Sequence, residues 1–496
     1  MTAFQIALLA LSVPLTCLLA CYGLHRVHLL WAYLKRRNDN PVPEGELADW
    51  PTVLVQVPVF NEGRVVRRVL EAVAAFDYPK DRLSIQLLDD STDDTPRIGA
   101  RVCRELLARG FRIEHLRRTD RSGFKAGALA EGLLRDDSEF VAIFDADFVP
   151  EPDFLKRTVP YFAKPSVGLV QARWDHLNME ENLLTRLQSF LIDGHFVMES
   201  TTRNRTGRFF NFNGTGGIWR RSCIDDAGGW SSRSIAEDTE ISLRAYLKGW
   251  KFVFLRDLTV PAELPADAAA YKSQQHRWAK GYTEILKAHL PTIWRAPLPF
   301  MTKVEATLML SNHFAFLLFG VLTILHLPIV LVRAGWHASP FVVFLDVLGL
   351  NLVLFAFFAF YVVSQREAGR LTWKRLAHVP LVLGLGMALM VNSCRAVLEA
   401  LFGLKTGFVR TPKEGDRPDP SYKARAAVIT ALTEVSLGLY LIVSTVVVVA
   451  HSHWLGAPLN LLVAFGFLFL GLPVLKRQWA PAPAPRAEPA PKTVGV

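Results

Sequence analysis

Long apolar runs divide this chain of 496 residues into parts that must fold in different solvents. A helix needs about 20 apolar residues to cross the hydrocarbon core of a bilayer, and each of these runs is near or above that length. The runs cover residues 3–34, 307–332, 341–363, 378–402, 426–450 and 457–475. The stretch from Trp50 to Pro291 has instead the mixed composition of a soluble domain. The sequence therefore predicts a soluble domain inserted into a bundle of membrane helices.

Basic residues indicate which runs span and in which direction. The run 3–34 is followed by the basic residues 35–37, the reverse of the charge order in a secretory signal peptide. We interpret it as a transmembrane signal anchor whose C-terminal end is cytoplasmic. If every later run spanned, the loop 403–425, rich in Lys and Arg, would lie outside. Every basic loop lies inside if 378–402 is an interfacial helix, so we expect that arrangement and about five spans.

The expected segments follow from this topology. They are a signal anchor at 1–34, a cytoplasmic domain at 50–291, an interfacial segment at 292–306, two transmembrane helices within 307–363, an interfacial helix at 378–402, a cytoplasmic loop at 403–425, two transmembrane helices within 426–475 and a disordered Ala/Pro-rich tail at 480–496.

Strand-like apolar segments alternate with amphipathic helical segments in the first part of the soluble stretch. The strand-like segments cover residues 52–60, 83–90, 111–116 and 140–147. This alternation predicts a parallel, doubly wound α/β sheet. Ligands of such sheets bind beyond the carboxyl ends of the strands.

Acidic residues occupy the ends of two of these strands. They are Asp89, Asp90, Asp145 and Asp147. Crowded carboxylates repel one another unless a cation joins them, and oxygen ligands with open positions suit Mg²⁺ or Mn²⁺, which in turn bind diphosphates. The alternative is that such residues only cap strands and turns, and for residues 93–94 a helix start is the favoured interpretation.

Three further positions are candidates, each with a structural alternative. Lys125 precedes a helix start of small residues, where phosphate can bind, although a surface lysine is more common. Asp238 lies in the first turn of a predicted helix and is a candidate general base, or it only complements the helix dipole. Gln274, Arg277 and Trp278 could bind a diphosphate and stack on a sugar, or anchor the chain at the membrane interface.

The motifs agree in order and spacing with one family. The chain resembles the family 2 glycosyltransferases with the D, D, D, Q(Q/R)xRW signature of processive polysaccharide synthases. Its motif sequences are most similar to those of the cellulose synthase-like A proteins, the mannan and glucomannan synthases. The resemblance covers roughly residues 50–425. The motifs that carry it are QVPVFNE, LLDDST, KAGALAEG, AIFDADFVPEPDF, LVQARW, FNGTGGIWRR, AEDTEISLRAYLKGWKF and QQHRW.

The resemblance implies a Rossmann-like GT-A fold and a role for each candidate. Asp90 would contact the nucleoside, Asp145 and Asp147 would hold the metal–diphosphate, Lys125 would contact the diphosphate, Asp238 would be the base, and Gln274, Arg277 and Trp278 would line the donor diphosphate and the acceptor end. The segment FVRTPK resembles the FxVTxK gating loop of cellulose synthases, with Phe408, Thr411 and Lys413 at the matching positions and Arg410 in place of valine. This and other departures, such as AED in place of TED, leave acceptor and product open.

The main functional interpretation is a membrane enzyme that uses GDP-mannose or UDP-glucose, with Mg²⁺ or Mn²⁺, to extend a β-linked polysaccharide and export it. The nearest alternative is a glycolipid synthase that adds a hexose to diacylglycerol or ceramide. A channel or sensor that merely binds nucleotide is a third. Nucleic acid is not an expected partner, because the basic residues follow the membrane face. We expect a multi-pass protein of the inner cell membrane, or of the Golgi if eukaryotic; a homo-oligomer or an export partner stays open.

Overall fold

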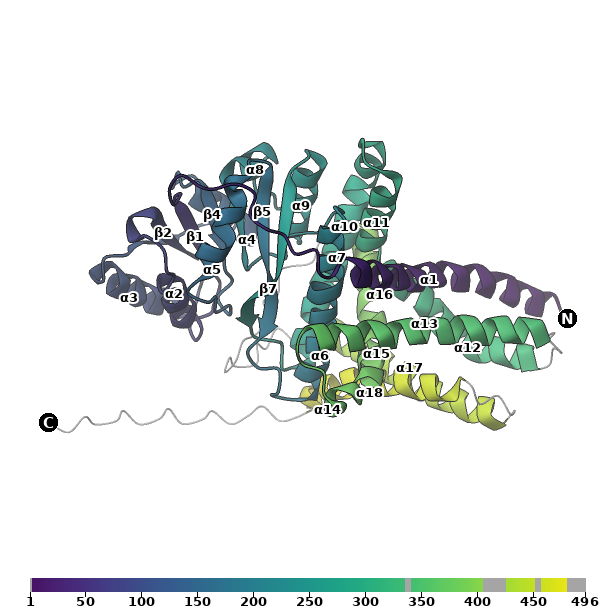
Figure 1. Ribbon diagram of the computed structural model, residues 1–496. Coiled ribbons are helices and arrows are strands. Elements are labelled where there is room, and N and C mark those ends of the chain that lie inside the picture. Colours follow the sequence, from purple (N-terminus) through teal and green to yellow (C-terminus); the bar gives the residue numbers. More distant parts are fainter. Residues whose placement is uncertain (1, 335–339, 405–424, 451–455, 480–496) are drawn as a thin grey trace.

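The computed structural model describes residues 2–334, 340–404, 425–450 and 456–479. A lobe that contains the sheet joins a bundle of long helices whose axes run away from it (Figure 1). The predicted gating-loop residues Phe408, Thr411 and Lys413 and the predicted tail 480–496 lie outside the described residues.

Seven strands form one sheet in the order β3-β2-β1-β4-β6-β5-β7. The strands are β1 Val53–Val59, β2 Leu83–Asp89, β3 Arg112–Arg117, β4 Phe140–Ile143, β5 Val167–His176, β6 Gly217–Arg220 and β7 Lys251–Ala262. The strands β1 to β4 pair in parallel, as the alternating sequence predicts. The second half differs, because β6 runs antiparallel to both β4 and β5. The sheet is therefore mixed rather than wholly parallel.

Helices cover both faces of the sheet. Alternate residues of β1 separate into two hydrophobic layers, with Val53 and Val55 on the side of α2 and α3 and Leu54 on the side of α4, α8 and α9. Burial on both faces explains why β1, β2 and β4 are nearly continuous apolar runs, whereas the edge strand β3 is partly exposed. The helical elements of this lobe are α2 Val66–Ala74, η1 Lys80–Arg82, α3 Thr95–Ala108, α4 Phe124–Leu133, α5 Phe154–Thr158, η2 Val159–Ala163, α6 Leu183–Asp193, η3 Gly194–Ser200, α7 Thr201–Arg205, α8 Arg221–Asp226 and α9 Glu237–Leu247.

The remaining helices build the bundle and its junction with the lobe. They are α1 Ala3–Arg36, α10 Ala268–Arg295, α11 Phe300–Leu310, α12 Phe314–Ala334, α13 Pro340–Glu367, α14 Trp373–Leu376, α15 Val379–Ala388, α16 Met390–Leu401, α17 Arg425–Ala450 and α18 Ala457–Trp479. The apolar run predicted at 307–332 is broken between α11 and α12, where the polar residues 311–313 form a turn.

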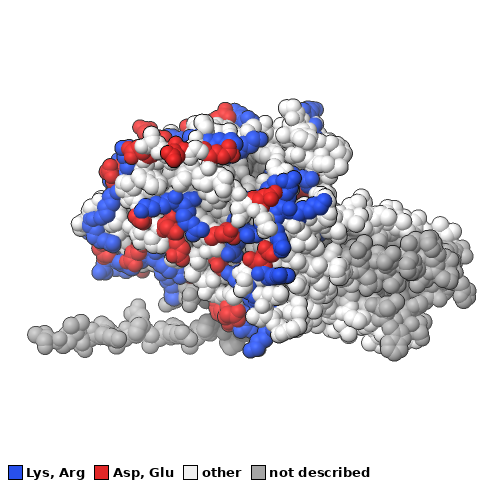
Figure 2. Space-filling view, in the orientation of Figure 1, with Lys and Arg blue, Asp and Glu red and all other residues white. Residues whose placement is uncertain are grey.

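Five helical stretches of the described residues are long and apolar enough to cross a membrane, by length and composition. They are Ala3–Arg36, Phe314–Val332, Trp373–Leu401, Ala427–Ala450 and Ala457–Arg477. In Figure 2 charged side chains cover the sheet lobe, whereas the described surface of the bundle is almost free of them. Residues 373–401 run across the axes of α1, α12 and α13, with α16 alongside α10 and α15 alongside α18 (Figure 1). This direction agrees with an interfacial helix, which stays a prediction.

Candidate functional site

A tight turn at Asn213–Thr215, just before β6, is the centre of the candidate site. Lys125, at the start of α4, donates from Nζ to Oδ1 of Asp145 at 2.6 Å and to the carbonyl oxygen of Gly214 at 2.7 Å. The backbone N–H of Asp145 donates to Oγ1 of Thr215 at 2.9 Å. The turn therefore joins the end of β4 to the start of α4, and Lys125 is not an isolated surface lysine.

Asp238 approaches the same turn from the start of α9. Its Oδ1 accepts the backbone N–H of Thr239 at 2.6 Å. Gly214 has a φ of +81°, and a Cβ at this position would lie 3.0 Å from Oδ2 of Asp238 and 3.4 Å from Nζ of Lys125. Glycine is required here because it permits both the backbone conformation and this close approach. The sequence-predicted residues Lys125, Asp145 and Asp238 thus lie together.

The charges at this centre are unbalanced. Burial, together with the neighbouring carboxylate of Glu237, raises the pKa of Asp238 to about 7, although Lys125 opposes the shift. Burial also raises the pKa of Glu237, and Asp145 adds to the effect. Burial would lower the pKa of Lys125, but Asp145 and Glu237 outweigh it and raise that pKa. The carboxylates share a single lysine at short range, which favours binding of a further cation.

Helix α10 brings the QQHRW motif to the same place. A Cβ on Gly281 would lie only 2.5 Å from the Cβ of Ala236, two residues before Asp238, so the helix rests directly on that loop. Gln274, Arg277 and Trp278 precede Gly281 by seven, four and three residues. Positions at these spacings share one face of a helix. The face formed by Gln274, Arg277 and Trp278, called the stripe, therefore lies towards the loop that carries Asp238. Arg277 is close enough to Glu237 to oppose the rise in the pKa of that carboxylate.

Asp90 lies at the same edge of the sheet but in a different environment. Arg118 donates from Nε to its Oδ1 at 2.9 Å and from Nη2 to its Oδ2, and these side chains are only 10% and 7% exposed. Arg121 lies 4.0 Å from the same carboxylate, with its guanidinium 3.3 Å from the centre of the Phe60 ring. The two arginines and the aromatic ring thus lie together beside Asp90.

Comparison with known proteins identifies this lobe. Residues 51–281 match a family model described as "Glycosyltransferase like family 2". This matching part of the chain is named the family 2 domain here. The likeness of the chain to a solved mannosyltransferase of Pyrobaculum calidifontis, in complex with GDP-Man and Mn²⁺, has a TM-score of 0.54 at 20% identity and covers 80% of this chain and 100% of that one. That likeness shows a shared fold.

Sequence relatives extend the match. Glucomannan 4-beta-mannosyltransferase 2 of Arabidopsis thaliana is 43% identical over 298 residues, which are 58% of this chain and 56% of the relative. Glucomannan 4-beta-mannosyltransferase 1 of Cyamopsis tetragonoloba is 46% identical over 243 residues, which are 48% and 46% of the two chains. The chain thus spans about half the length of the relatives it matches.

Asp147 is almost fully buried, two residues beyond Asp145 in the family 2 domain. The side chain of Asp145, by contrast, is 36% exposed and can be reached by a ligand. Among the described residues, no three His, Cys, Asp or Glu side chains are grouped as a ready-made metal cage. Two carboxylates nevertheless suit Mg²⁺ or Mn²⁺, since such ions are commonly held by one or two carboxylates together with substrate phosphates.

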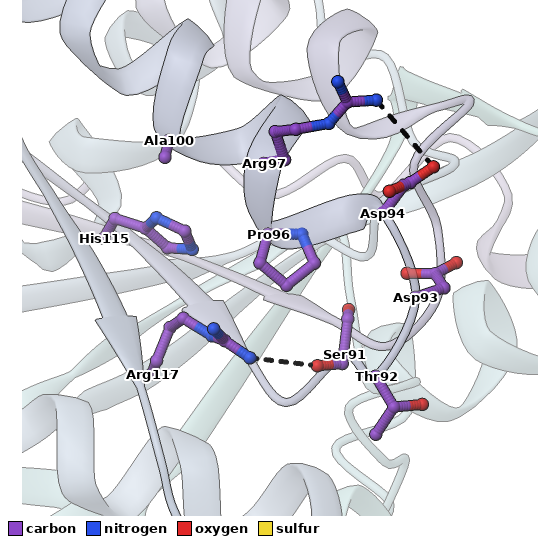
Figure 3. Close-up of a pocket in the computed structure, with 9 residues that line it drawn as sticks. All are labelled: Ser91, Thr92, Asp93, Asp94, Pro96, Arg97, Ala100, His115 and Arg117. Carbon is purple, nitrogen blue, oxygen red and sulfur yellow. Dashed lines mark hydrogen bonds and ion pairs between the residues drawn. The ribbon is translucent and has the colours of Figure 1, made fainter.

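A hollow of about 460 Å³ lies at the outer edge of the family 2 domain, beside β3 (Figure 3). Asp93 accepts the backbone N–H of Thr95 at 2.9 Å and Asp94 is the N-cap residue of α3, so this second acidic pair begins a helix as the sequence suggests. Arg97 is paired with Asp94, and Arg117 donates to the carbonyl oxygen of Ser91 (Figure 3). The hollow contains none of the residues around the turn, and we assign it no role.

Sequence reasoning missed Arg118, Arg121 and the turn residues Asn213–Thr215 as parts of the site. The two arginines follow β3, and their position beyond the carboxyl end of a predicted parallel strand was the available signal. The turn follows no predicted strand, because β6 is short and enters the sheet antiparallel. Its FNGTGG sequence, with two glycines at positive φ, was the signal for a close approach of the backbone.

Proposed function

We propose that this chain is a membrane-embedded inverting hexosyltransferase that transfers a sugar from a nucleotide sugar to a growing β-linked polysaccharide. The observation that supports this most is the meeting of Lys125, Asp145 and Asp238 at one glycine turn. A paired ammonium and carboxylate suit a metal–diphosphate, and a second carboxylate with a raised pKa suits proton removal from a hydroxyl. The glucomannan 4-beta-mannosyltransferases that it resembles give the reaction type.

In this mechanism Asp238 acts as the general base. Its carboxylate takes the proton from an acceptor hydroxyl, whose oxygen then bonds to the anomeric carbon of the donor. The bond from that carbon to the diphosphate oxygen breaks, and the nucleoside diphosphate leaves with the electron pair. Direct displacement inverts the anomeric carbon, so no nucleophilic side chain is required. A pKa of about 7 keeps a useful fraction of Asp238 ionised near neutral pH.

The other residues bind and orient the two substrates. Asp90, between its arginines, would contact the nucleoside. Lys125 and Arg277 would offset the negative charge of the diphosphate, and Trp278 would stack on the acceptor sugar. Gln274 would contact the same region from one helical turn away. We also propose that the segment with Phe408, Thr411 and Lys413, outside the described residues, is the gating loop that the resemblance implies.

Asp145 and Asp147 would hold Mg²⁺ or Mn²⁺. When bound, the ion supplies positive charge that stabilises the leaving nucleoside diphosphate. We therefore expect excess EDTA to abolish transfer, and addition of either ion to restore it, in an assay that follows labelled donor. Full transfer in EDTA would contradict this role.

GDP-mannose is the proposed donor, ahead of UDP-glucose, because the relatives at 43% to 46% identity are named as mannosyltransferases. The acceptor is proposed to be a β-glycan, which the bundle would export. The distribution of Lys and Arg supports a cytoplasmic family 2 domain, at the inner membrane or the Golgi.

Purified full-length protein in nanodiscs tests the proposal. It is incubated with labelled GDP-mannose or UDP-glucose and Mn²⁺, and the product is divided into a solvent-extractable lipid fraction and an insoluble fraction. We expect label in insoluble polymer that endo-β-mannanase releases. Label confined to extractable lipid would show a glycolipid synthase instead, and no turnover of either donor would favour a nucleotide-binding sensor.

A further inference from the structure

The turn Asn213–Thr215 is held from its far side as well as from the acidic centre. The backbone N–H of Asn213 donates to Oε1 of Gln171 at 3.2 Å, and Nε1 of Trp174 donates to the carbonyl oxygen of Thr215 at 3.4 Å. These contacts fix the backbone at the two ends of the turn. The side chain of Asn213 has a support in addition to the amide nitrogen of Asn211, which donates to its Oδ1 at 3.4 Å.

His195 supplies that support from η3, a stretch of π-helix that continues α6. Its Nε2 lies 3.0 Å from Oδ1 of Asn213. The amide nitrogen of Asn213 donates to the carbonyl oxygen of Asn211 at 3.2 Å, which directs the amide oxygen towards the imidazole. Single turns of π-helix occur frequently at functional sites, where they aim a side chain that an α-helix would place elsewhere.

The other side of the imidazole faces Glu199. Its Nδ1 lies 3.5 Å from Oε2 of Glu199, whose side chain is 15% exposed. Arg203 lies 3.2 Å from the same carboxylate, and Arg26 of α1 lies 3.6 Å from it. Burial opposes ionisation of Glu199, but Arg203 and the other cations outweigh burial and hold its pKa well below the usual range. Glu199 thus stays charged and fixes the orientation of the ring.

We propose that His195 is a positioning residue for glycosyl transfer. It holds Asn213, so that the carbonyl of Gly214 stays on Lys125 and the hydroxyl of Thr215 stays on the backbone of Asp145. The contacts continue through Glu199 to Arg26, so one network of polar contacts connects the first predicted membrane helix to the turn. The expected effect of His195 on the rate of transfer rests on the proposed function. Its expected effect on the conformation of the turn rests only on these contacts.

Two substitutions of His195 distinguish the contact of Nε2 with Asn213 from the contact of Nδ1 with Glu199. The amide nitrogen of Gln reaches about as far as Nε2, so His195→Gln keeps the contact with Asn213. The amide nitrogen of Asn reaches about as far as Nδ1, so His195→Asn keeps the contact with Glu199 and loses the turn. A difference between these variants therefore reports on the turn rather than on general packing.

His176 provides a matched control. Its Nε2 lies 3.0 Å from Oδ1 of Asp193, and both side chains are buried. Asp193 is held in turn by Arg370 and Gln365. This is another histidine–carboxylate pair within the lobe, and Arg370 connects it to the bundle, but it supports the end of β5 instead of the turn. We expect His176→Asn to alter the melting temperature while leaving kcat unchanged.

The first measurement is the kinetics of transfer by full-length protein in nanodiscs. A displacement of about 1 Å can cost roughly 10²-fold in rate, so we expect His195→Asn to lose about that much in kcat, with the donor KM changed less than about threefold. His195→Gln should remain within about tenfold of the unsubstituted protein. Equal kcat values for the Gln and Asn variants would overturn the proposal.

The second measurement does not depend on activity. Hydrogen exchange of peptides that cover residues 209–217 should become faster in His195→Asn and stay near the unsubstituted rate in His195→Gln and His176→Asn. If the protein transfers no sugar at all, the proposed function fails, and this measurement still decides whether His195 holds the turn. Unchanged exchange in His195→Asn would show that it does not.

Discussion

Two acidic centres lie beyond the carboxyl ends of the strands but have opposite electrostatic states. Asp89 and Asp90 at the end of β2 are already paired, Asp89 with His115 at 2.8 Å and Asp90 with Arg118. Hydrogen bonds from His115 and Ser91 outweigh burial and lower the pKa of Asp89. At the second centre, Asp238 and its neighbours share Lys125, and the pKa of Asp238 is raised instead.

On the proposed function, the difference suits one centre to binding and the other to chemistry. A carboxylate that is already paired presents fixed hydrogen-bonding groups at little further cost, which suits recognition of a nucleoside. A cluster with an excess of negative charge is unstable until a cation or a proton joins it, which suits a metal and a base. The predictions below change one centre at a time.

Asp238→Asn should have the largest effect. Asn keeps the size and the contact with Thr239 but cannot accept the proton, so the rate of transfer should fall by about 10²–10⁴. Affinity for the nucleoside diphosphate should barely change, because Asp90, Lys125 and Arg277 remain. Single-turnover assays and calorimetric titration with GDP measure the two quantities. A loss of less than about tenfold would mean that another group is the base.

Lys125→Met should have the second largest effect. Loss of a hydrogen-bonded charge is worth about 1.5–3 kcal/mol, so kcat/KM should fall by roughly 10–100-fold. The base works when ionised, so the rate should decline as pH falls through about 7 in the unsubstituted protein. Because Lys125 opposes the raised pKa of Asp238, its removal should move that decline to higher pH. An unshifted profile would separate Lys125 from the base.

Asp90→Asn should act on binding with little effect on chemistry. The neutral amide still contacts Arg118 but leaves one positive charge unbalanced, so the donor KM should rise by about tenfold or less while kcat stays the same. Steady-state kinetics over a range of donor concentrations distinguish the two. A large fall in kcat at saturating donor would place Asp90 in the chemical step.

The smallest effect concerns stability. The pKa of Asp238 is raised from 3.8 to about 7, so between these pH values the folded state binds more protons than the unfolded state. Stability therefore falls as pH rises through that window. Without metal or nucleotide, Asp238→Asn should melt at a higher temperature than the unsubstituted protein at pH 8, and at nearly the same temperature at pH 4. If Asp238→Asn melts at a lower temperature than the unsubstituted protein at pH 8, the negative charge of Asp238 does not destabilise the folded state.

The parts of the molecule that the sequence predicts well are those with a local signal. The strands β1, β2 and β4 are buried on both faces, so their apolar runs, and the acids that follow β2 and β4, were visible. The mixed half of the sheet was not, because the direction of β6 depends on its partners rather than on its own four residues. His195 has no motif around it, and only packing of η3 against the turn brings it to Asn213. Such contacts between distant segments carry no period that a single sequence could reveal.

The contact between Gly281 and Ala236 also limits which changes of length the chain can accept. Each residue in an α-helix turns the chain by about 100°, so a single residue inserted into α10 before Gln274 leaves the stripe in phase with Gly281 but shifts both against Asp267, the cap of the helix. The same insertion between Trp278 and Gly281 turns the stripe away from the loop, while Gly281 keeps its contact with Ala236. A seven-residue insertion would nearly restore the phase yet lengthen the helix by about 10 Å. Deletions and duplications in this helix should therefore be far less tolerated than substitutions on its opposite face.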